Sequence, residues 1–199
     1  LLAQTKKFNE AKQLLNKVIE IQPHNKDAHN NLGNVLKELG EFQKAVNCYQ
    51  KVLQIDPDFI FAHDNLGTVF KELGELEKSI ICYQKAIKIQ PNYVAAHNNL
   101  GIIYKELGEY QKAINCYKKA IQINLNYADA HNNLGILYKE LGKYTEAFFS
   151  YQKSIFINPN HINAIRNVSI LSRDLRLNNI TKTNNASLKK LFLLLFKRN

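Results

Sequence analysis

One segment of this chain recurs four times at intervals of 34 residues, and this period restricts the fold more than any single residue does. The recurring marker is Ala-x-x-Asn-Leu-Gly, which begins at Ala28, Ala62, Ala96 and Ala130, and an altered fifth copy begins at Ala164. A fixed period of this size is typical of solenoid and array proteins, in which each repeat buries its apolar face against its neighbours. Such proteins usually work through an extended surface, not through a catalytic pocket.

Each repeat contains two helical patterns separated by a turn. The first pattern ends in Lys-Glu-Leu-Gly, at Gly40 in the first full repeat, and a glycine at this place is typical of a helix C-terminus. In the second pattern, from Phe42 to Ile55, apolar residues follow one another at gaps of three and four, which indicates one buried stripe on a helix. Proline, which cannot continue a helix, follows the second pattern in three of the four repeats. The residues at this position are Pro57, Pro91, Leu125 and Pro159.

The residues at fixed positions of the repeat resemble those of the tetratricopeptide repeat family. With Lys26 as position 1 of the first full repeat, Leu and Gly hold positions 7 and 8, an aromatic residue or Leu position 11, a small residue position 20, Tyr position 24 and a small apolar residue position 27. In the third repeat these residues are Leu100, Gly101, Tyr104, Ala113, Tyr117 and Ala120. The resemblance covers about residues 1–177, and it departs from the family pattern at position 4, where histidine replaces tryptophan. The Ala-His-Asn-Asn-Leu sequence is most similar to the repeat arrays of O-linked N-acetylglucosamine transferases.

The resemblance implies an all-α fold, a right-handed α-solenoid of stacked helix-turn-helix units. We expect full repeats at residues 26–59, 60–93, 94–127 and 128–161, and a partial repeat at residues 1–25 with Leu2 at position 11 and Ala11 at position 20. Residues 162–177 are expected to form a capping helix, and residues 178–199 a polar linker and a basic apolar tail. Because the chain begins inside a repeat and has no methionine, we interpret it as a piece of a longer protein.

The net charge of +10 is unevenly distributed along the chain. Residues 26–161 hold 15 basic and 14 acidic residues, whereas residues 162–199 hold eight basic and one acidic residue. A nearly neutral array is not expected to follow the phosphates of a nucleic acid. For the tail we favour a helix that belongs to a following domain or repeat, and contact with an acidic partner or lipid surface is the alternative. Its apolar run at 191–196 is far too short to cross a bilayer, so no transmembrane segment is expected.

The cysteines and histidines also recur in phase, and they predict neither a disulfide nor a metal site. Residues one repeat apart on stacked helices lie about 10 Å from one another, beyond disulfide reach. Free thiols and the lack of a signal peptide favour a cytoplasmic or nuclear protein. Histidines one repeat apart cannot converge as zinc ligands do, so we expect them to pack between helices. These residues are Cys48, Cys82 and Cys116, and at position 4 His29, His63, His97 and His131.

Columns of polar residues on the first helix of each repeat are the best candidates for a binding site. Positions 2, 5, 9 and 12 share one face of a helix, and the resemblance implies that the first helices line a concave groove. Asparagine both donates and accepts, so a row of asparagines can hold an extended peptide through its backbone, at about 1 kcal/mol for each hydrogen bond. The alternative is that the asparagines cap or space the repeat. Position 6 holds Asn31, Asn65, Asn99, Asn133 and Asn167, position 5 holds Asn30, Asp64, Asn98, Asn132 and Arg166, and position 12 holds Lys37, Lys71, Lys105, Lys139 and Arg173.

This groove differs from the carboxylate clamp of chaperone-binding members of the family, which has Lys at position 5 and Asn at position 9. Isoleucine holds position 9 in three consecutive repeats, which favours partly apolar ligands in the C-terminal half of the groove. The residues at position 9 are Asn34, Thr68, Ile102, Ile136 and Ile170.

The sequence therefore predicts a protein–protein interaction scaffold that binds an extended peptide or a partner helix in the groove. It has no Gly-rich phosphate loop, nucleophile elbow or paired carboxylates, so we expect this segment to have no catalytic residue, metal or cofactor. The alternative is the substrate-recruiting region of a larger enzyme, such as an O-linked N-acetylglucosamine transferase-like glycosyltransferase. The sequence that follows residue 199 distinguishes the two.

Overall fold

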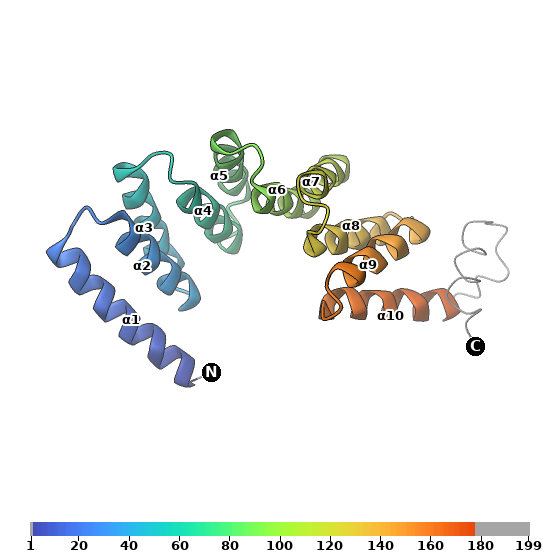
Figure 1. Ribbon diagram of the computed structural model, residues 1–199, viewed down its shortest axis with the longest axis horizontal. Helices are drawn as coiled ribbons and strands as arrows, with labels where there is room; N and C mark the ends of the chain where they lie inside the picture. Colours follow the sequence, from blue (N-terminus) through green and yellow to red (C-terminus); the bar gives the residue numbers. More distant parts are fainter. Residues whose placement is uncertain (1, 178–199) are drawn as a thin grey trace. The chain divides into compact units, whose positions relative to one another are not determined.

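The computed structural model describes residues 2–177, and it describes side chains for residues 5–173. This part of the chain is helical, with no strand, which confirms the all-α class (Figure 1). The expected linker and basic tail, residues 178–199, lie outside the described residues. The helices are α1 (Leu2–Ile21), α2 (Lys26–Glu38), α3 (Phe42–Ile55), α4 (Ile60–Glu72), α5 (Leu76–Ile89), α6 (Val94–Glu106), α7 (Tyr110–Ile123), α8 (Ala128–Glu140), α9 (Tyr144–Ile157) and α10 (Ile162–Leu177).

The helices follow the 34-residue period. We call α2, α4, α6, α8 and α10 the A helices, because each begins at position 1 of a repeat, and α3, α5, α7 and α9 the B helices, because each begins at position 17. The contacts within the chain define two compact units, Leu1–Ile103 and Tyr104–Asn199, which are described separately. In the first unit α1 packs on α2, α2 on α3, α3 on α4, and α4 on α5, and α2 also contacts α4. In the second unit α7 packs on α8, α8 packs on α9, and α10 packs on both α8 and α9.

A glycine in the left-handed conformation ends the A helix of each full repeat. After α2, the N–H of Gly40 donates to the carbonyl of Lys37 at 3.0 Å, and the N–H of Glu41 donates to the carbonyl of Leu36 at 2.8 Å. This pair of hydrogen bonds is the Schellman motif, and the φ of 74° at Gly40 is one that residues with a Cβ atom rarely adopt. The predicted helix ends at glycine are therefore confirmed. The equivalent residues are Gly74, Gly108 and Gly142.

At the N-terminal end, Lys6 holds the position at which the full repeats carry the turn glycine. Helix α1 continues through this position without a break, from Leu2 to Ile21. Lysine carries a Cβ atom, which disfavours the left-handed conformation that the turn needs. The chain therefore stays helical through this point.

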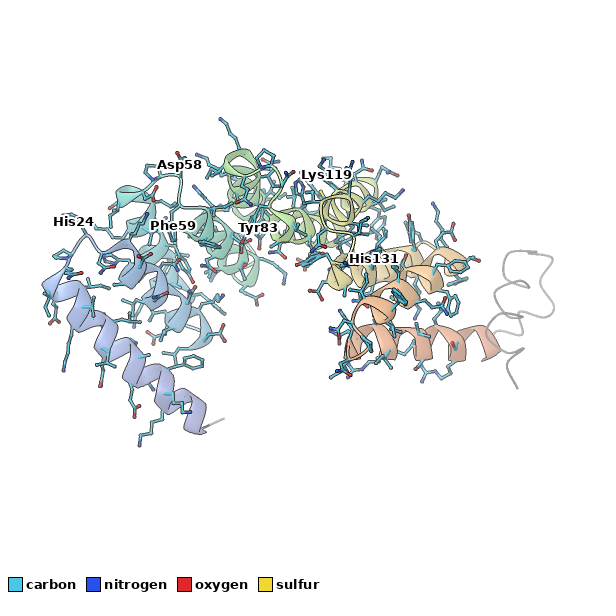
Figure 2. The ribbon with its side chains drawn as sticks, viewed as in Figure 1. His24, Asp58, Phe59, Tyr83, Lys119 and His131 are labelled. Carbon is cyan, nitrogen blue, oxygen red and sulfur yellow. The ribbon has the colours of Figure 1, made fainter. Side chains whose placement is uncertain are left out.

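The A and B helices of a repeat cross where a glycine faces a tyrosine. Tyr83, on α5, is only 1% exposed (Figure 2). A Cβ atom added to Gly67, on α4, would lie 2.7 Å from the Cε1 atom of Tyr83. The corresponding distance is 2.6 Å both for Gly33 against Tyr49 and for Gly135 against Tyr151. The glycine at position 8 is therefore required because the tyrosine ring lies directly against its Cα atom.

We predict that Gly67→Ala lowers the free energy of unfolding by about 1–3 kcal/mol, the usual cost of overpacking a core. The measurement is urea denaturation followed by circular dichroism. Tyr83→Leu is the matched partner, because α1 carries Leu15 at this position of the repeat. The double variant should be less destabilised than the sum of the single variants, since leucine lacks the ring atoms that the new methyl group meets. If the losses of unfolding free energy of the two single variants simply add in the double variant, Gly67 and Tyr83 are not in direct contact.

Candidate functional site

On the A helices, the position 6 side chain of one repeat donates to the position 5 side chain of the repeat before it. In the unit Leu1–Ile103, Nδ2 of Asn65 donates to Oδ1 of Asn30 at 3.4 Å. One repeat later, Nδ2 of Asn99 donates to Oδ1 of Asp64, also at 3.4 Å. These two hydrogen bonds join α2 to α4 and α4 to α6, and we call this row of contacts the amide ladder.

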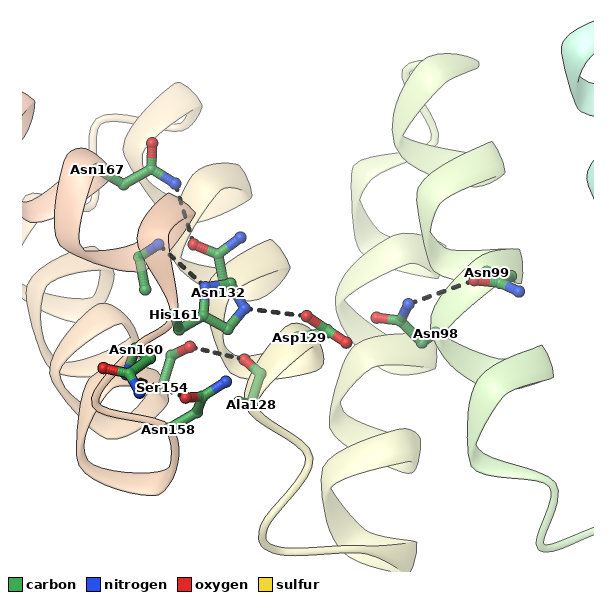
Figure 3. A network of polar contacts seen from close by, with 11 residues as sticks. Asn98, Asn99, Ala128, Asp129, Asn132, Ser154, Asn158, Asn160, His161 and Asn167 are labelled. Atoms are coloured by element: carbon green, nitrogen blue, oxygen red, sulfur yellow. Dashed lines mark hydrogen bonds and ion pairs between the residues drawn. The ribbon is translucent and has the colours of Figure 1, made fainter. Parts of the chain in front are cut away.

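The same contact occurs in the unit Tyr104–Asn199. Nδ2 of Asn167, on α10, donates to Oδ1 of Asn132, on α8, at 3.0 Å (Figure 3). Next to it, His161 and Asp129 form a second link, with Nε2 of His161 2.9 Å from Oδ1 of Asp129. The 34-residue period does not predict the ladder, because each of these bonds joins residues 35 apart.

The predicted site residues differ in how accessible they are. Asn98 and Asn132 are only 4% exposed, whereas Asn30 and Asn65 are half-buried and Asn31 is exposed. An amide that accepts through Oδ1, as Asn30 does, still carries two N–H donors that can face a ligand. Half-buried residues at position 5 and position 6 can therefore both hold the ladder and contact a ligand. Asn99, Asn133 and Asn167 are also half-buried.

Asp64 is the acidic member of the position 5 column. Burial raises the pKa of its carboxyl group, while hydrogen bonds from Tyr93 and Asn99 and the charge of Lys37 act in the opposite direction. The carboxylate accepts the ladder bond from Asn99 in the same way that the amide of Asn30 accepts the bond from Asn65. Aspartate and asparagine are therefore interchangeable as acceptors at this position, although only asparagine can also donate.

The lysines at position 12 are half-buried and partly engaged with acidic residues. Nζ of Lys105 lies 2.7 Å from Oε1 of Glu140, and Nζ of Lys71 lies 3.3 Å from Oε1 of Glu72. These contacts lie near the surface, where an ion pair contributes only about 0–1 kcal/mol to stability. They therefore leave the lysines able to exchange partners with an acidic group of a ligand. Lys37 and Lys139, at the same position, are half-buried as well.

Position 9 supplies partners for the buried tyrosines in the first unit. The hydroxyl of Tyr49 donates to Oδ1 of Asn34 at 2.8 Å, and the hydroxyls of Thr68 and Tyr83 lie 3.1 Å apart. Burial raises the pKa of both tyrosines. In the second unit, Ile136 at position 9 packs on the core around Tyr151. The change from polar to apolar residues at position 9 therefore has a packing role, which the repeat pattern alone does not predict.

The histidines at position 4 fasten each A helix to the turn that precedes it. Each Nε2 atom lies within hydrogen-bond distance of a backbone carbonyl six residues earlier, and a carbonyl only accepts, so Nε2 carries the hydrogen. Their side chains are buried, as the predicted packing role requires, but the polar edge contacts the backbone. The distances are 2.9 Å for His29 to Pro23, for His63 to Pro57 and for His97 to Pro91, and 3.2 Å for His131 to Leu125.

The remaining reactive side chains form no recognisable chemical centre in the part of the chain that the structure describes. Within residues 5–173, no three His, Cys, Asp or Glu side chains come together as metal ligands do. The three cysteines are free thiols, and burial raises the pKa of Cys82 and of Cys116 to about 11, so both are protonated at neutral pH. None of the described helices combines the length and the apolar character that crossing a bilayer requires.

Comparison with known proteins shows one family and several solved structures of similar fold. The model of the family described as TPR repeat matches residues 1–40, 67–108 and 102–142, and that described as tetratricopeptide repeat matches residues 27–59 and 128–161. No curated protein matches the chain.

Three solved structures illustrate the similarity of fold. The crystal structure of MamA has a TM-score of 0.69 and 26% identity, over 79% of this chain and 92% of MamA. TTC0263, a thermophilic TPR protein of Thermus thermophilus, has a TM-score of 0.71 and 21% identity, over 85% of this chain and 93% of that protein. YrrB, described as a TPR protein with an unusual peptide-binding site, has a TM-score of 0.65 and 19% identity, over 93% of each chain.

The burial of His131 predicts a loss of stability in acid. Burial is the largest cause that lowers the pKa of His131 below its ordinary value, and the charge of Lys153 adds to it, against the opposing hydrogen bond to Leu125. The unfolded chain therefore binds a proton at His131 more readily, so the free energy of unfolding falls as the pH drops below about 6.5. We predict that His131→Gln, which keeps an N–H donor, has a smaller decrease in melting temperature between pH 7 and pH 5. If the melting temperature of His131→Gln falls as much between pH 7 and pH 5 as that of the wild type, the burial of His131 is not the cause of the loss of stability.

Proposed function

Because the chain belongs to the tetratricopeptide repeat family, we propose that the A helices of the unit Leu1–Ile103 bind an extended peptide segment of a partner protein. The observation that carries this proposal is the amide ladder, which holds half-buried Asn and Asp side chains in a fixed order on α2, α4 and α6. The fold is that of a family of interaction scaffolds, and YrrB, which shares it, is described as having a peptide-binding site.

The ladder suits a peptide backbone because each of its contacts leaves N–H donors on one side chain and an acceptor oxygen on the other. At the contact between Asn65 and Asn30, one amide uses a donor and the other uses its acceptor. The N–H groups of Asn30 and the Oδ1 atom of Asn65 are the complementary groups left for a ligand. Packed helices lie about 8–10 Å apart, and an extended chain rises about 3.3 Å for each residue. About three peptide residues therefore separate one contact point from the next.

The charged residues near the ladder suggest which peptides fit. Lys37 and Lys71 at position 12 favour acidic side chains, whereas Asp64 favours a donor or a basic side chain beside it. Backbone contacts make the binding tolerant of sequence, and these charges set the preferred register. The alternative function, recruitment of substrates to an attached catalytic domain, would use the same face. No feature of residues 2–177 favours it, and the complete open reading frame is the observation that decides.

The test uses a substitution that keeps the ladder and removes a donor. Peptides selected from a random phage-displayed library against the full chain would be titrated by calorimetry against wild-type protein and Asn30→Asp. Aspartate still accepts the bond from Asn65, as Asp64 does from Asn99, but it cannot donate to a peptide carbonyl. We predict a loss of affinity of about five- to tenfold, the value of one hydrogen bond of roughly 1 kcal/mol.

Asn47→Asp is the matched control, because it adds the same charge on an exposed position of the B helix α3. It should leave the affinity unchanged, and the melting temperatures of both variants should stay close to that of the wild type. If the selected peptides bind Asn30→Asp as tightly as the wild type, the A helices of this unit are not the binding surface.

A further inference from the structure

A cavity of about 600 Å³ lies away from the amide ladder, between α5 and the turn that joins α3 to α4. Pro57 and Asp58 of this turn line one side, and Figure 2 shows Asp58 there. The B helix α5 lines the other side, with Ile81 and Ile89 among its residues. The volume is within the range of ligand pockets in proteins, about 300–1,000 Å³.

The lining combines exposed apolar side chains with positive charge. Ile81 is 54% exposed and Ile89 is 36% exposed, so both offer apolar surface to a ligand. Lys85 and Lys88 also line the cavity, against one acidic side chain, Asp58, among the described lining residues. The cavity is therefore complementary to an apolar group that lies next to a negative charge.

Comparison of the repeats shows that this combination is particular to the second one. At the position of Ile81, the first and third repeats carry Asn47 and Asn115, and at the position of Lys88 they carry Gln54 and Gln122. The 34-residue period maintains the core, but it does not require these exposed residues. Their difference from the neighbouring repeats therefore has no packing reason.

The lysine at position 26 has a glutamine partner in the first and third repeats. Lys51 donates to Gln54 at 3.3 Å, and Lys119 donates to Gln122 at 3.3 Å. In the second repeat the glutamine is replaced by Lys88, which places two positive charges three residues apart on one helix face, an unfavourable arrangement. A ligand carboxylate between Lys85 and Lys88 would relieve this repulsion.

We propose that this cavity binds a second peptide segment, one in which an apolar side chain is flanked by acidic residues. The apolar side chain enters the space between Pro57, Ile81 and Ile89, and the carboxylates pair with Lys85 and Lys88. This site is distinct from the A-helix site. Its lining comes from the turn between α3 and α4, from the B helix α5 and from His63, and it includes no residue of the amide ladder. The chain then contacts its partners through two surfaces of the same unit.

The probe is a fluorescein-labelled peptide, Gly-Ser-Glu-Phe-Glu-Ser-Gly, titrated into the full chain and followed by fluorescence anisotropy. Replacing its phenylalanine by serine, or its glutamates by glutamines, should weaken binding at least tenfold. The double variant Ile81→Asn/Lys88→Gln gives α5 the residues of the third repeat, so it should fold normally and lose affinity at least tenfold.

Two controls separate this site from others. Phe149→Asn removes an exposed aromatic residue at the corresponding position of the fourth repeat, and Asn30→Asp alters the proposed A-helix site. Neither should change the affinity for the probe. Absence of saturable binding by the wild type, equal binding by Ile81→Asn/Lys88→Gln, or loss of binding in Phe149→Asn would each overturn the proposal. A failure of the A-helix proposal would leave these results unaffected.

Discussion

The contact between a glycine on the A helix and a tyrosine on the B helix is the constraint on which each repeat depends. Because the ring of Tyr83 lies directly against Gly67, the two helices approach closely and the ring is almost fully buried. A buried hydroxyl then needs a partner, and Thr68 lies 3.1 Å from it. In this repeat, one steric contact thus connects the residues at three positions, on two helices.

Polar contacts add direction to the apolar packing between one repeat and the next. Apolar surfaces attract without direction, so they fix distance better than register. The hydrogen bond from His63 to the carbonyl of Pro57 fixes the start of α4 against the preceding turn. The amide ladder, from Asn65 to Asn30, fixes α4 against α2. Each bond contributes only about 1 kcal/mol, but each requires one particular alignment, and both recur in other repeats of the chain.

The sequence alone predicted most of the repeat. Periodicity and the glycine signal located the A and B helices, because they depend on residues near one another in the chain. The continuous helix α1 was not predicted, since its cause is a lysine, Lys6, where the turn needs glycine. The ladder was also missed, because a bond between residues 35 apart does not follow a column of identical positions. The cavity beside α5 depends on how the side chains of Ile81 and Lys88 face a turn 23 or more residues earlier, which no local pattern contains.

The exposure of Ile81 also bears on how such a chain changes during evolution. A duplicated repeat brings its own glycine, tyrosine and histidine, so a new copy is stable from the start. Substitutions on the outer side of a B helix, where Asn115 takes the place of Ile81, then alter what the copy binds with little effect on its stability. A repeat array can therefore gain new interactions one copy at a time, while its older copies keep the interactions that they already have.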